Sequence, residues 1–237
     1  MKLRNGFIAV FFWTVRFLQS KIRMGRRALP KVDQSVDISS RYSVLDEISA
    51  PLDPQTLFEE PRPLEIEVGS GKGLFLMTHC QRRPDHNFLG NELAVKYAQF
   101  AAHRFVKHDC KNVHMIQGDG LKLFREFLPA ESAVAVHIYF PDPWWKERHR
   151  RRRVVQPEMV TDIQRVLVPG GRLHFWTDVE EYFESGIATI KANSKLAGPF
   201  EVEQEAATHD MDYRTHFERR MRKNDHPVFR SEFEKQT

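Results

Sequence analysis

The sequence predicts an α/β protein built on a doubly wound, mostly parallel sheet, and three observations lead to this fold class. Short apolar runs alternate with helical stretches from Leu64 to the end of the chain. The first apolar run ends in a glycine-rich turn, and acidic residues follow the ends of several runs. Alternating strands and helices favour parallel strands joined by crossover helices. Because ligands of such sheets bind at the carboxyl ends of the strands, the turn and the acids predict a ligand site there.

Seven strands and four main helices are expected along the chain. The strands are expected over Leu64–Val68, Asn87–Glu92, Val113–Ile116, Ala133–Phe140, Arg172–Thr177, Phe200–Glu205 and Val228–Phe233. The helices are expected over Gly73–Gln81, Ala94–Lys107, Gln156–Leu167 and Val179–Asn193. The fourth strand consists mostly of valine, isoleucine and aromatic residues, which is typical of a strand buried on both faces. A Pro-Gly-Gly sequence at residues 169–171 ends the third helix.

The chain is expected to comprise an N-terminal arm, residues 1–62, and one domain, residues 63–237. The arm is rich in proline, serine and charged residues, with a short helix expected near Pro54–Phe58. Its apolar run Gly6–Val15 is flanked by basic residues and is far shorter than the roughly 20 residues that span a bilayer. A membrane-surface helix, a secretion signal and an upstream extension are three interpretations of this run. The third is favoured, with Met24 as an alternative start, and no membrane partner is expected.

Composition describes an ordinary globular protein with a weak basic bias. The 237 residues are 41% hydrophobic and 29% charged, and the net charge of +4 is only a slight indication of an anionic partner. Cys80 and Cys110 are the two cysteines, and no CxxC occurs. The sequence therefore predicts a reduced, cytoplasmic protein without a disulfide framework. The histidines show no metal-ligand spacing, so no metal is expected.

The glycine-rich turn favours S-adenosyl-L-methionine as the ligand. Gly69, Gly71 and Gly73 follow the first strand in a GxGxG spacing, and Leu74 stands where the dinucleotide fingerprint GxGxxG needs its last glycine. Glu67 lies two residues before the turn. A carboxylate there would repel the pyrophosphate of NAD, whereas it suits a ligand that carries an ammonium and a sulfonium group.

Two further acids occur at the ends of the next strands. Glu92 ends the second strand, nineteen residues beyond Gly73, a spacing that suits hydrogen bonds to both ribose hydroxyls. Asp119 follows the third strand and can accept a hydrogen bond from an adenine amino group. Each acid alone has an ordinary interpretation as a loop carboxylate. Together with Glu67 they place acids at three successive strand ends, which predicts a cofactor site.

The loop after the fourth strand predicts a substrate site. Two prolines flank Asp142 and restrict where its carboxylate points. Either Trp144 or Trp145 can pack against a base or close the pocket. Six of the eight residues from Lys146 to Arg153 are lysine or arginine. An isolated run of this kind is usually a solvated helix start, but beside a rigid acidic loop it favours contacts with phosphates.

These motifs together resemble the bacterial tRNA (guanine-N7)-methyltransferase family. The matching pieces occur in family order, namely the turn at Glu67–Gly73, Gly90–Glu92, Gly118-Asp119, the FPDPWWK stretch at Phe140–Lys146 with Arg148-His149, Thr177-Asp178, and Thr215–Glu218 with Arg220. The chain departs from the family at Asn91, where a small or aliphatic residue is more common. It also has Asn224–Pro227 where glycines usually follow the TxFE motif.

The resemblance implies a Rossmann-like, class I methyltransferase that uses S-adenosyl-L-methionine and acts on tRNA. The implied cofactor contacts are Glu67, Gly69, Gly71, Glu92, Asp119 and Asp142. The implied contacts to the tRNA guanosine are Lys146, Asp178, Thr215, His216, Phe217 and Glu218. The implied reaction methylates N7 of a guanosine at position 46 in the variable loop, with Asp142 as the catalytic candidate. A monomer and a homodimer are both compatible with the sequence.

Three other functions are weighed against this one. A methyltransferase of rRNA or of a small molecule would share the cofactor site, although the basic run argues against a small substrate. A non-catalytic RNA-binding protein would not need the three acids. A NAD-linked dehydrogenase is disfavoured by the glycine spacing. Guanine N7 carries a lone pair and no proton, so catalysis is expected to depend on positioning and not on a general base.

Overall fold

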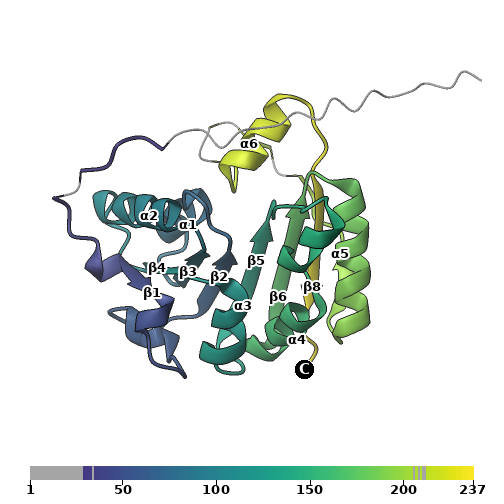
Figure 1. Cartoon of the computed structure of the whole chain (residues 1–237), viewed down its shortest axis with the longest axis horizontal. Helices are drawn as coiled ribbons and strands as arrows, with labels where there is room; N and C mark the ends of the chain where they lie inside the picture. Colours follow the sequence, from purple (N-terminus) through teal and green to yellow (C-terminus); the bar gives the residue numbers. More distant parts are fainter. Residues whose placement is uncertain (1–28, 34, 205, 208, 210–211) are drawn as a thin grey trace, which may run out of the picture. The chain divides into compact units, whose positions relative to one another are not determined.

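The computed structural model describes residues 29–33, 35–204, 206–207, 209 and 212–237 (Figure 1). The chain divides into two compact units, residues 1–30 and residues 31–237. Everything described below belongs to the second unit. The expectations for Gly6–Val15 and for Met24 lie outside the described residues.

The second unit is built on one eight-stranded sheet with the order β1-β4-β3-β2-β5-β6-β8-β7. The strands are β1 Tyr42–Val44, β2 Leu64–Val68, β3 Asn87–Glu92, β4 Val113–Gln117, β5 Ala133–Tyr139, β6 Leu167–Thr177, β7 Ala197–Phe200 and β8 Phe229–Glu234. The strands from β1 to β6 in this order pair in parallel, whereas β8 runs antiparallel to both β6 and β7. The doubly wound, mostly parallel sheet is thus confirmed, with one strand more than predicted.

Three strands differ from the prediction. Strand β6 begins at Leu167 and not at Arg172, so the Pro-Gly-Gly sequence expected to end the preceding helix lies within the strand. The other two differences lie at the edges of the sheet. The strand predicted over Phe200–Glu205 is wrong, because β7 spans Ala197–Phe200 and residues 201–204 are irregular. The Ala-Gly-Pro-Phe sequence of β7 has little strand propensity, and its pairing with β8 defines the strand instead. The additional strand β1 has only three residues, which is too short for a periodic signal.

The segment before residue 63 contributes to this unit. Strand β1 pairs with β4, and the 3-10 turns η1 (Ser39–Arg41) and η2 (Leu45–Glu47) flank it. Leu45 and Leu52 are buried in the core. A 3-10 turn, η3, spans Pro54–Leu57, where a short helix is predicted. The sheet therefore begins before residue 63, where the sequence analysis expects the domain to start.

Helices cover the sheet in two layers (Figure 1). The helices are α1 Leu74–Arg82, α2 Val95–Lys107, α3 Gly120–Lys122 with a following π-helical turn η4 (Leu123–Phe127), α4 Pro157–Val166, α5 Glu180–Asn193 and α6 His216–Lys223. Helices α1 and α2 bury one core against β3 and β4, around Phe88 and Phe105. Helices α4 and α5 bury a larger core on the other face, around Phe175 and Tyr182. No helix of the described residues is both long and apolar enough to cross a membrane.

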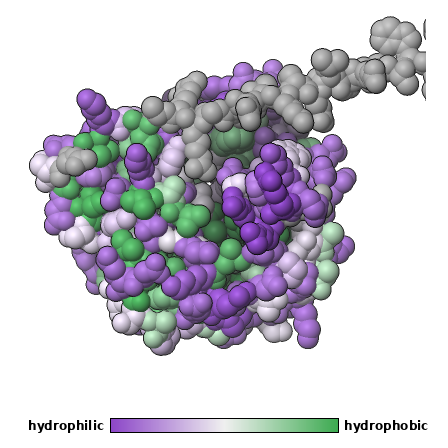
Figure 2. Space-filling view, in the orientation of Figure 1, coloured by the Kyte–Doolittle hydropathy of each residue, from purple (hydrophilic) through white to green (hydrophobic). Residues whose placement is uncertain are grey.

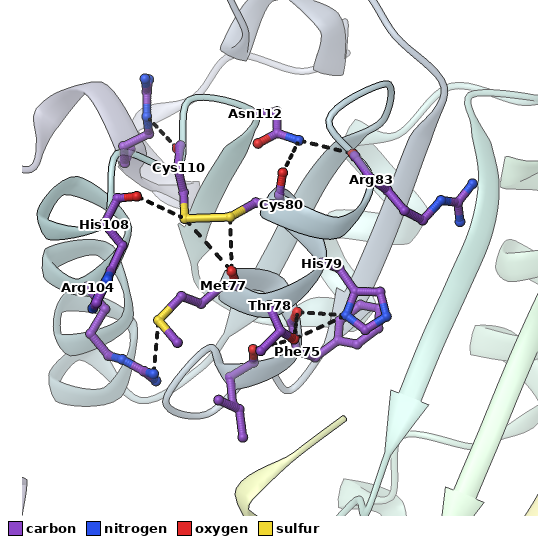
Figure 3. Close-up of a disulfide and its surroundings, with 12 residues drawn as sticks. Phe75, Met77, Thr78, His79, Cys80, Arg83, Arg104, His108, Cys110 and Asn112 are labelled. Atoms are coloured by element: carbon purple, nitrogen blue, oxygen red, sulfur yellow. Dashed lines mark hydrogen bonds between the residues drawn. A yellow bond between two sulfur atoms is a disulfide. The ribbon is translucent and has the colours of Figure 1, made fainter. Parts of the chain in front are cut away.

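A disulfide joins Cys80 in α1 to Cys110 in the turn after α2 (Figure 3). This corrects the prediction of no disulfide. The turn after α2 returns beside α1 and brings the two Cα atoms to 5.9 Å, a proximity that a sequence separation of 30 does not reveal. Nearby, Arg104 donates to the Lys72 carbonyl at 2.7 Å, and Asn112 donates to the Cys80 carbonyl at 3.2 Å. The disulfide therefore links α1 to the turn after α2, and the Arg104 hydrogen bond links α2 to the glycine turn.

Candidate active site

The topology gathers the predicted acids along one edge of the sheet. Neighbouring strands β4, β3, β2, β5 and β6 run in parallel, so their carboxyl ends meet at this edge. In that strand order, the acids at or just beyond the strand ends are Asp119, Glu92, Glu67, Asp142 and Asp178. The winding of the chain reverses between β2 and β5, where a ligand crevice is expected in an open α/β sheet. The acids predicted separately from the sequence thus form a single row.

The glycine turn is anchored on one side and open on the other. Gly69 and Gly71 have φ angles of +78° and +54°, a left-handed conformation that glycine adopts without strain. The amides of Gly69 and Ser70 both donate to the Asn91 carbonyl, at 2.8 and 2.9 Å. A Cβ atom added at Gly69 or Gly71 would meet nothing within 4 Å. The turn is therefore rigidly held by β3 and leaves open space for a ligand.

Glu67 is buried beside this turn and is incompletely satisfied. The residue is 3% exposed, and its Oε2 atom has no hydrogen-bond partner among the residues that the structure describes. Burial raises the pKa of Glu67 to about 8, opposed by a hydrogen bond from Ser70 and reinforced by the charge of Glu92. A buried carboxyl with an unpaired oxygen is costly unless a ligand completes it. The site therefore suits a ligand that brings a cationic hydrogen-bond donor, such as the ammonium group of S-adenosyl-L-methionine.

Glu92 connects the glycine turn with the start of α2. Its Oε2 atom accepts from the Gly71 amide at 2.9 Å, and its Oε1 atom accepts from the Ala94 amide at 2.8 Å. Both bonds fix the direction of the carboxylate, which is half-buried. Each carboxylate oxygen can accept a second hydrogen bond, so the side chain can also receive a ligand hydroxyl.

Asn91 organises the turn that carries Asp119, a role that sequence reasoning missed. The buried Asn91 amide donates to the carbonyls of Ile116 and Gly118, at 3.3 and 3.1 Å. Asp119 itself is exposed and accepts from the Leu121 amide at 2.9 Å, which caps the start of α3. In the sequence Asn91 is visible only as a departure from the family pattern, whereas in the structure it supports both the glycine turn and the Asp119 turn.

The loop after β5 is folded back on itself and exposes Asp142. Phe140 and Trp144 have φ angles of +50° and +44°, which are uncommon for residues with side chains. Arg153 donates to the Pro143 carbonyl at 2.8 Å and so closes the loop. Asp142 lies between the two strained positions and is exposed. Strained backbone of this kind is consistent with a functional loop.

The two tryptophans of this loop have different environments. Arg152 lies 5.2 Å from the Trp144 ring centroid, and His149 contacts the same ring edge-on at 5.8 Å. Trp145, by contrast, is 59% exposed. The short helix η5 (Glu147–Arg152) follows, and strongly hydrophilic side chains gather over its position in the space-filling view (Figure 2). Trp144 is thus held within the loop, whereas Trp145 is available beside a basic surface.

The TxFE segment forms the start of α6. The Thr215 hydroxyl accepts from the Glu218 amide at 2.9 Å, and the Glu218 carboxylate accepts from the Arg214 amide at 2.8 Å. The spacing is that of a capping box, but Glu218 accepts from the amide of Arg214, one residue before the N-cap Thr215, and not from the Thr215 amide itself. The sequence analysis used the motif only for its family resemblance and did not predict α6. The Thr-x-x-Glu spacing is the local signal that would have located the helix.

The start of α6 lies beside both loops of the candidate site. The ring of Phe217 packs on that of Phe140 with 5.1 Å between centroids. Burial lowers the pKa of His216 to about 4, and the charges of Arg104, Lys72 and two arginines of α6 contribute to this shift. His216 therefore lies near Lys72 in the glycine turn. The folded chain brings residues 215–217 to the row of acids from a sequence distance of about 140 residues.

The remaining predicted substrate residues have three different environments. Lys146 is exposed at the start of the lysine- and arginine-rich segment Lys146–Arg153, which we call the basic loop. Asp178 is half-buried beyond β6, and burial raises its pKa. Glu218 is 2% exposed, and its Oε1 atom accepts from Arg222 and Arg230 at 3.2 and 3.3 Å. Among the described residues, no group of three or more histidine, cysteine or acidic side chains could hold a metal ion.

The fold and the site define a methyltransferase of Rossmann-like architecture. A family model described as "Putative methyltransferase" matches residues 61–231. The solved structure of a SAM-dependent methyltransferase from Aquifex aeolicus has the same fold, with a TM-score of 0.50 at 14% identity over 73% of this chain and 81% of that one. The predicted cofactor, S-adenosyl-L-methionine, agrees with this class.

More similar sequences specify the family. A tRNA (guanine-N(7)-)-methyltransferase from Rhodopirellula baltica is 46% identical over 90% of this chain and 81% of its own length. One from Paracidovorax citrulli is 33% identical over 76% of this chain and 72% of its own length. The chain belongs to the tRNA (guanine-N(7)-)-methyltransferase family, as the motifs predict.

Proposed function

We propose that the protein transfers a methyl group from S-adenosyl-L-methionine to N7 of a guanosine at position 46 in the variable loop of tRNA. The family supports the reaction on tRNA guanine, and the motif resemblance supports the position. The observation that carries the proposal is the buried, unpaired Glu67 carboxyl beside an open glycine turn, at the edge where the basic loop and the start of α6 meet.

The row of acids is proposed to hold the cofactor. When bound, S-adenosyl-L-methionine supplies an electrophilic methyl group on a sulfonium. Glu67 would accept hydrogen bonds from its ammonium group, and the open backbone at Gly69 and Gly71 would accommodate it closely. Glu92, fixed by two backbone amides, would accept from the ribose hydroxyls. Asp119 would accept from the adenine amino group.

The substrate guanosine needs positioning and charge compensation from the protein. Guanine N7 attacks with a lone pair that carries no proton, so no residue has to act as a base. Asp142 is exposed at the edge, between two positions of strained backbone. Its carboxylate can accept from guanine N1–H and N2–H and can offset the positive charge that develops on the ring. Asp178 and the segment Thr215–Phe217 are proposed to complete the guanosine site.

The basic loop is proposed to bind the tRNA backbone. Lys146 and the arginines of η5 form a cationic surface directly after Asp142. Such a surface contacts phosphates and gives a binding constant that falls steeply with salt. The exposed ring of Trp145 lies beside it and can stack on a base. Phosphate contacts position the RNA, while Asp142 selects the base.

Mapping of the modified base tests the proposal. Unmodified tRNA transcripts with G46, and matched transcripts with adenine at that position, are incubated with labelled S-adenosyl-L-methionine, and the labelled nucleotide is located. We expect 7-methylguanosine at position 46 in the first substrate and no label in the second. Equal labelling of both transcripts, or of an rRNA fragment instead, would contradict the proposal.

We expect the protein to act in the cytoplasm, where tRNA is available. The disulfide between Cys80 and Cys110 is unusual for that compartment, in which thiols are mostly kept reduced. Titration of free thiols in protein purified under alkylating conditions measures how much of the pair is oxidised in the cell. A fully oxidised pair would favour another compartment or a bridge that resists reduction.

A further inference from the structure

Arg214, the residue before the capped helix α6, turns its side chain towards the sheet. Its Nη1 atom donates to the Tyr139 hydroxyl at 2.9 Å, and its guanidinium lies 4.8 Å from the Trp176 ring centroid. Tyr139 ends β5, and Trp176 is the penultimate residue of β6, so both lie at the carboxyl edge of the sheet. Neither the motifs nor the family resemblance pointed to Arg214.

Tyr139 and Trp176 form a buried, closely packed aromatic surface against which the Arg214 guanidinium lies. Tyr139 and Trp176 are both buried, and their rings pack edge-on with 5.1 Å between centroids. The ring of Phe75 in α1 packs against the Tyr139 ring in the same core cluster, with 5.2 Å between centroids. Burial raises the pKa of Tyr139 well above its usual range, so its hydroxyl keeps its proton at neutral pH. The acceptor of the Arg214 hydrogen bond is therefore fixed in place and neutral.

The Tyr139 hydroxyl also belongs to a buried chain of hydrogen bonds in which the donor and the acceptor of each bond can be assigned. Burial lowers the pKa of His137 to about 3, so its imidazole is neutral and has one N–H group. Its Nε2 atom lies 2.8 Å from Glu65, and its Nδ1 atom lies 2.9 Å from the Tyr139 hydroxyl. Because Glu65 is ionised and can only accept, Nε2 donates to it and Nδ1 accepts from Tyr139. The Tyr139 oxygen is thereby left to accept from Arg214.

The backbone of Arg214 belongs to the cap of α6. Its amide donates to the Glu218 carboxylate at 2.8 Å, directly before the Thr215 cap. One residue therefore connects the helix start, through its main chain, with the sheet, through its side chain. The guanidinium also lines a polar cavity of about 430 Å³ on this face of the sheet, together with His79, His174 and Glu232.

We infer that Arg214 is a positioning residue that holds Thr215–Glu218 over the row of acids by fixing α6 to Tyr139 and Trp176. This inference rests on the proposed function, in which Thr215–Phe217 contact the guanosine. Arg214 itself is not assigned a contact with cofactor or substrate. Its loss should leave the cofactor site intact and allow the start of α6 to move away from the edge.

The experiment compares Arg214→Ala and Arg214→Lys with the wild type and with a control. Arg172→Ala is the matched control, because Arg172 lies on the same face of the sheet, in the middle of β6 and four residues before Trp176, and pairs with Glu232 and Glu234 at 3.1 and 3.3 Å. Three kinds of measurement are made. Steady-state kinetics give kcat and KM for tRNA, calorimetry gives the Kd of S-adenosyl-L-methionine, and amide hydrogen exchange is followed over residues 215–223. Tyr139→Phe removes the hydroxyl, and with it both the acceptor for Arg214 and the donor to His137, and serves if Arg214→Ala does not fold.

For Arg214→Ala we expect faster amide exchange over residues 215–223, a loss of kcat/KM for tRNA on the order of 10- to 100-fold, and a Kd for the cofactor within about twofold of the wild type. Arg214→Lys can still donate to Tyr139 but has no planar guanidinium, so it should recover part of the loss. Tyr139→Phe should give a smaller loss of the same kind, and Arg172→Ala should behave as the wild type.

Unchanged exchange and unchanged kcat/KM in Arg214→Ala would overturn the inference, as would an equal loss in Arg172→Ala or a parallel loss of cofactor binding. Failure of the proposed function has a different signature. In that case the wild type itself would not methylate tRNA, while the exchange measurement would still decide whether Arg214 fixes α6.

Discussion

The two faces of the sheet at strands β5, β6 and β8 differ sharply, although the same three strands form both. Because successive residues of a strand point to opposite faces, each strand contributes alternately to the two sides. On one face, Ile138, Phe175 and Phe233 are fully buried against the core of α4 and α5. This side resembles any apolar protein interior, and its role is to hold the fold together.

The opposite face presents a row of polar side chains one residue away. His137 is paired in register with His174, and His174 with Glu232, so the three lie side by side across three strands. The two imidazole rings stack with 4.6 Å between centroids. His174 lies 3.1 Å from Glu232, and His137 lies 2.8 Å from Glu65. The comparison teaches that one side of this sheet region serves stability, while the other carries the polar and aromatic side chains through which we infer that Arg214 positions α6.

The largest expected effect is on the apolar face. Phe175→Ala should lower the free energy of unfolding by about 3–5 kcal/mol, because it removes a fully buried ring between Tyr182 and Phe183. Urea denaturation measures this loss. A change below about 1 kcal/mol would contradict the assignment of this face as the stabilising core.

At the edge of the sheet, activity and stability should separate. Asp142→Ala should reduce turnover by about 100- to 1,000-fold, since the carboxylate is proposed to orient guanine and to offset its developing charge. Because Asp142 is exposed, the unfolding midpoint should stay close to that of the wild type. Cofactor binding should largely survive in calorimetry. Near-normal turnover would remove Asp142 from the mechanism.

Glu65, on the polar face, should make the free energy of unfolding depend on pH. Burial disfavours the charge of Glu65, but the hydrogen bond from His137 and the charge of Arg83 outweigh burial and lower the pKa of Glu65 to about 2. A depressed carboxyl pKa stabilises the fold above the unfolded value of 4.5, and this contribution is lost as pH falls from there through about 2.

The loss should be on the order of 2 kcal/mol. Urea denaturation between pH 6 and pH 3 measures it in the wild type and in Glu65→Gln. We expect the variant to be less stable at pH 6 and to show a flatter pH profile. Parallel profiles for the two proteins would show that Glu65 is not the group that titrates.

The adjacent tryptophans should differ in what they affect. Trp145→Ala should weaken tRNA binding by about tenfold through the loss of base stacking, with an unchanged unfolding midpoint. Trp144→Ala should instead destabilise the loop, since Arg152 and His149 pack on that ring. Filter binding at several salt concentrations, combined with thermal melting, separates the two. Equal binding losses would mean that both rings act through loop structure.

The last prediction concerns pH and the cofactor. In the unliganded protein, burial raises the pKa of Glu67 to about 8, so the carboxyl is mostly protonated at pH 6. A bound ammonium group favours the carboxylate, so binding should release a proton and affinity should increase by up to about tenfold per pH unit towards pH 7.5. Calorimetry at pH 6 and pH 7.5 measures this, and Glu67→Gln should lose the increase. A pH-independent Kd in the wild type would argue against direct contact.

Local patterns predicted the central strands and the glycine turn well. Strands β2 and β3 occupy the predicted residues: β2 alternates apolar residues with glutamate before the glycine turn, and β3 carries Phe88 and Leu89 between turn signals. The order of acids along the edge also follows from the alternation of strands and helices. The prediction of a single cofactor edge therefore needed no knowledge of side-chain contacts.

The parts that were missed depend on contacts between distant residues. Strand β7 exists because β8 pairs with it, and the Cys80–Cys110 bridge exists because the turn after α2 lies beside α1. The role of Asn91 depends on the carbonyl of Gly118, which belongs to the turn after β4. Arg214 reaches Tyr139 across 75 residues of sequence. Nothing in the residues themselves reveals such partners before the chain is folded.

The polar row has a consequence for how the edge of the sheet assembles. Strand β8 is the one antiparallel partner of β6 among the described residues, and it could in principle slide along its neighbour. A slip of one residue would turn Glu232 towards the apolar core and expose Phe233 on the polar side. Burying an unpaired carboxylate is far more costly than losing one pairing position. The alternation of charge and aromatic ring in β8 thus disfavours pairings that are misaligned by one residue during folding.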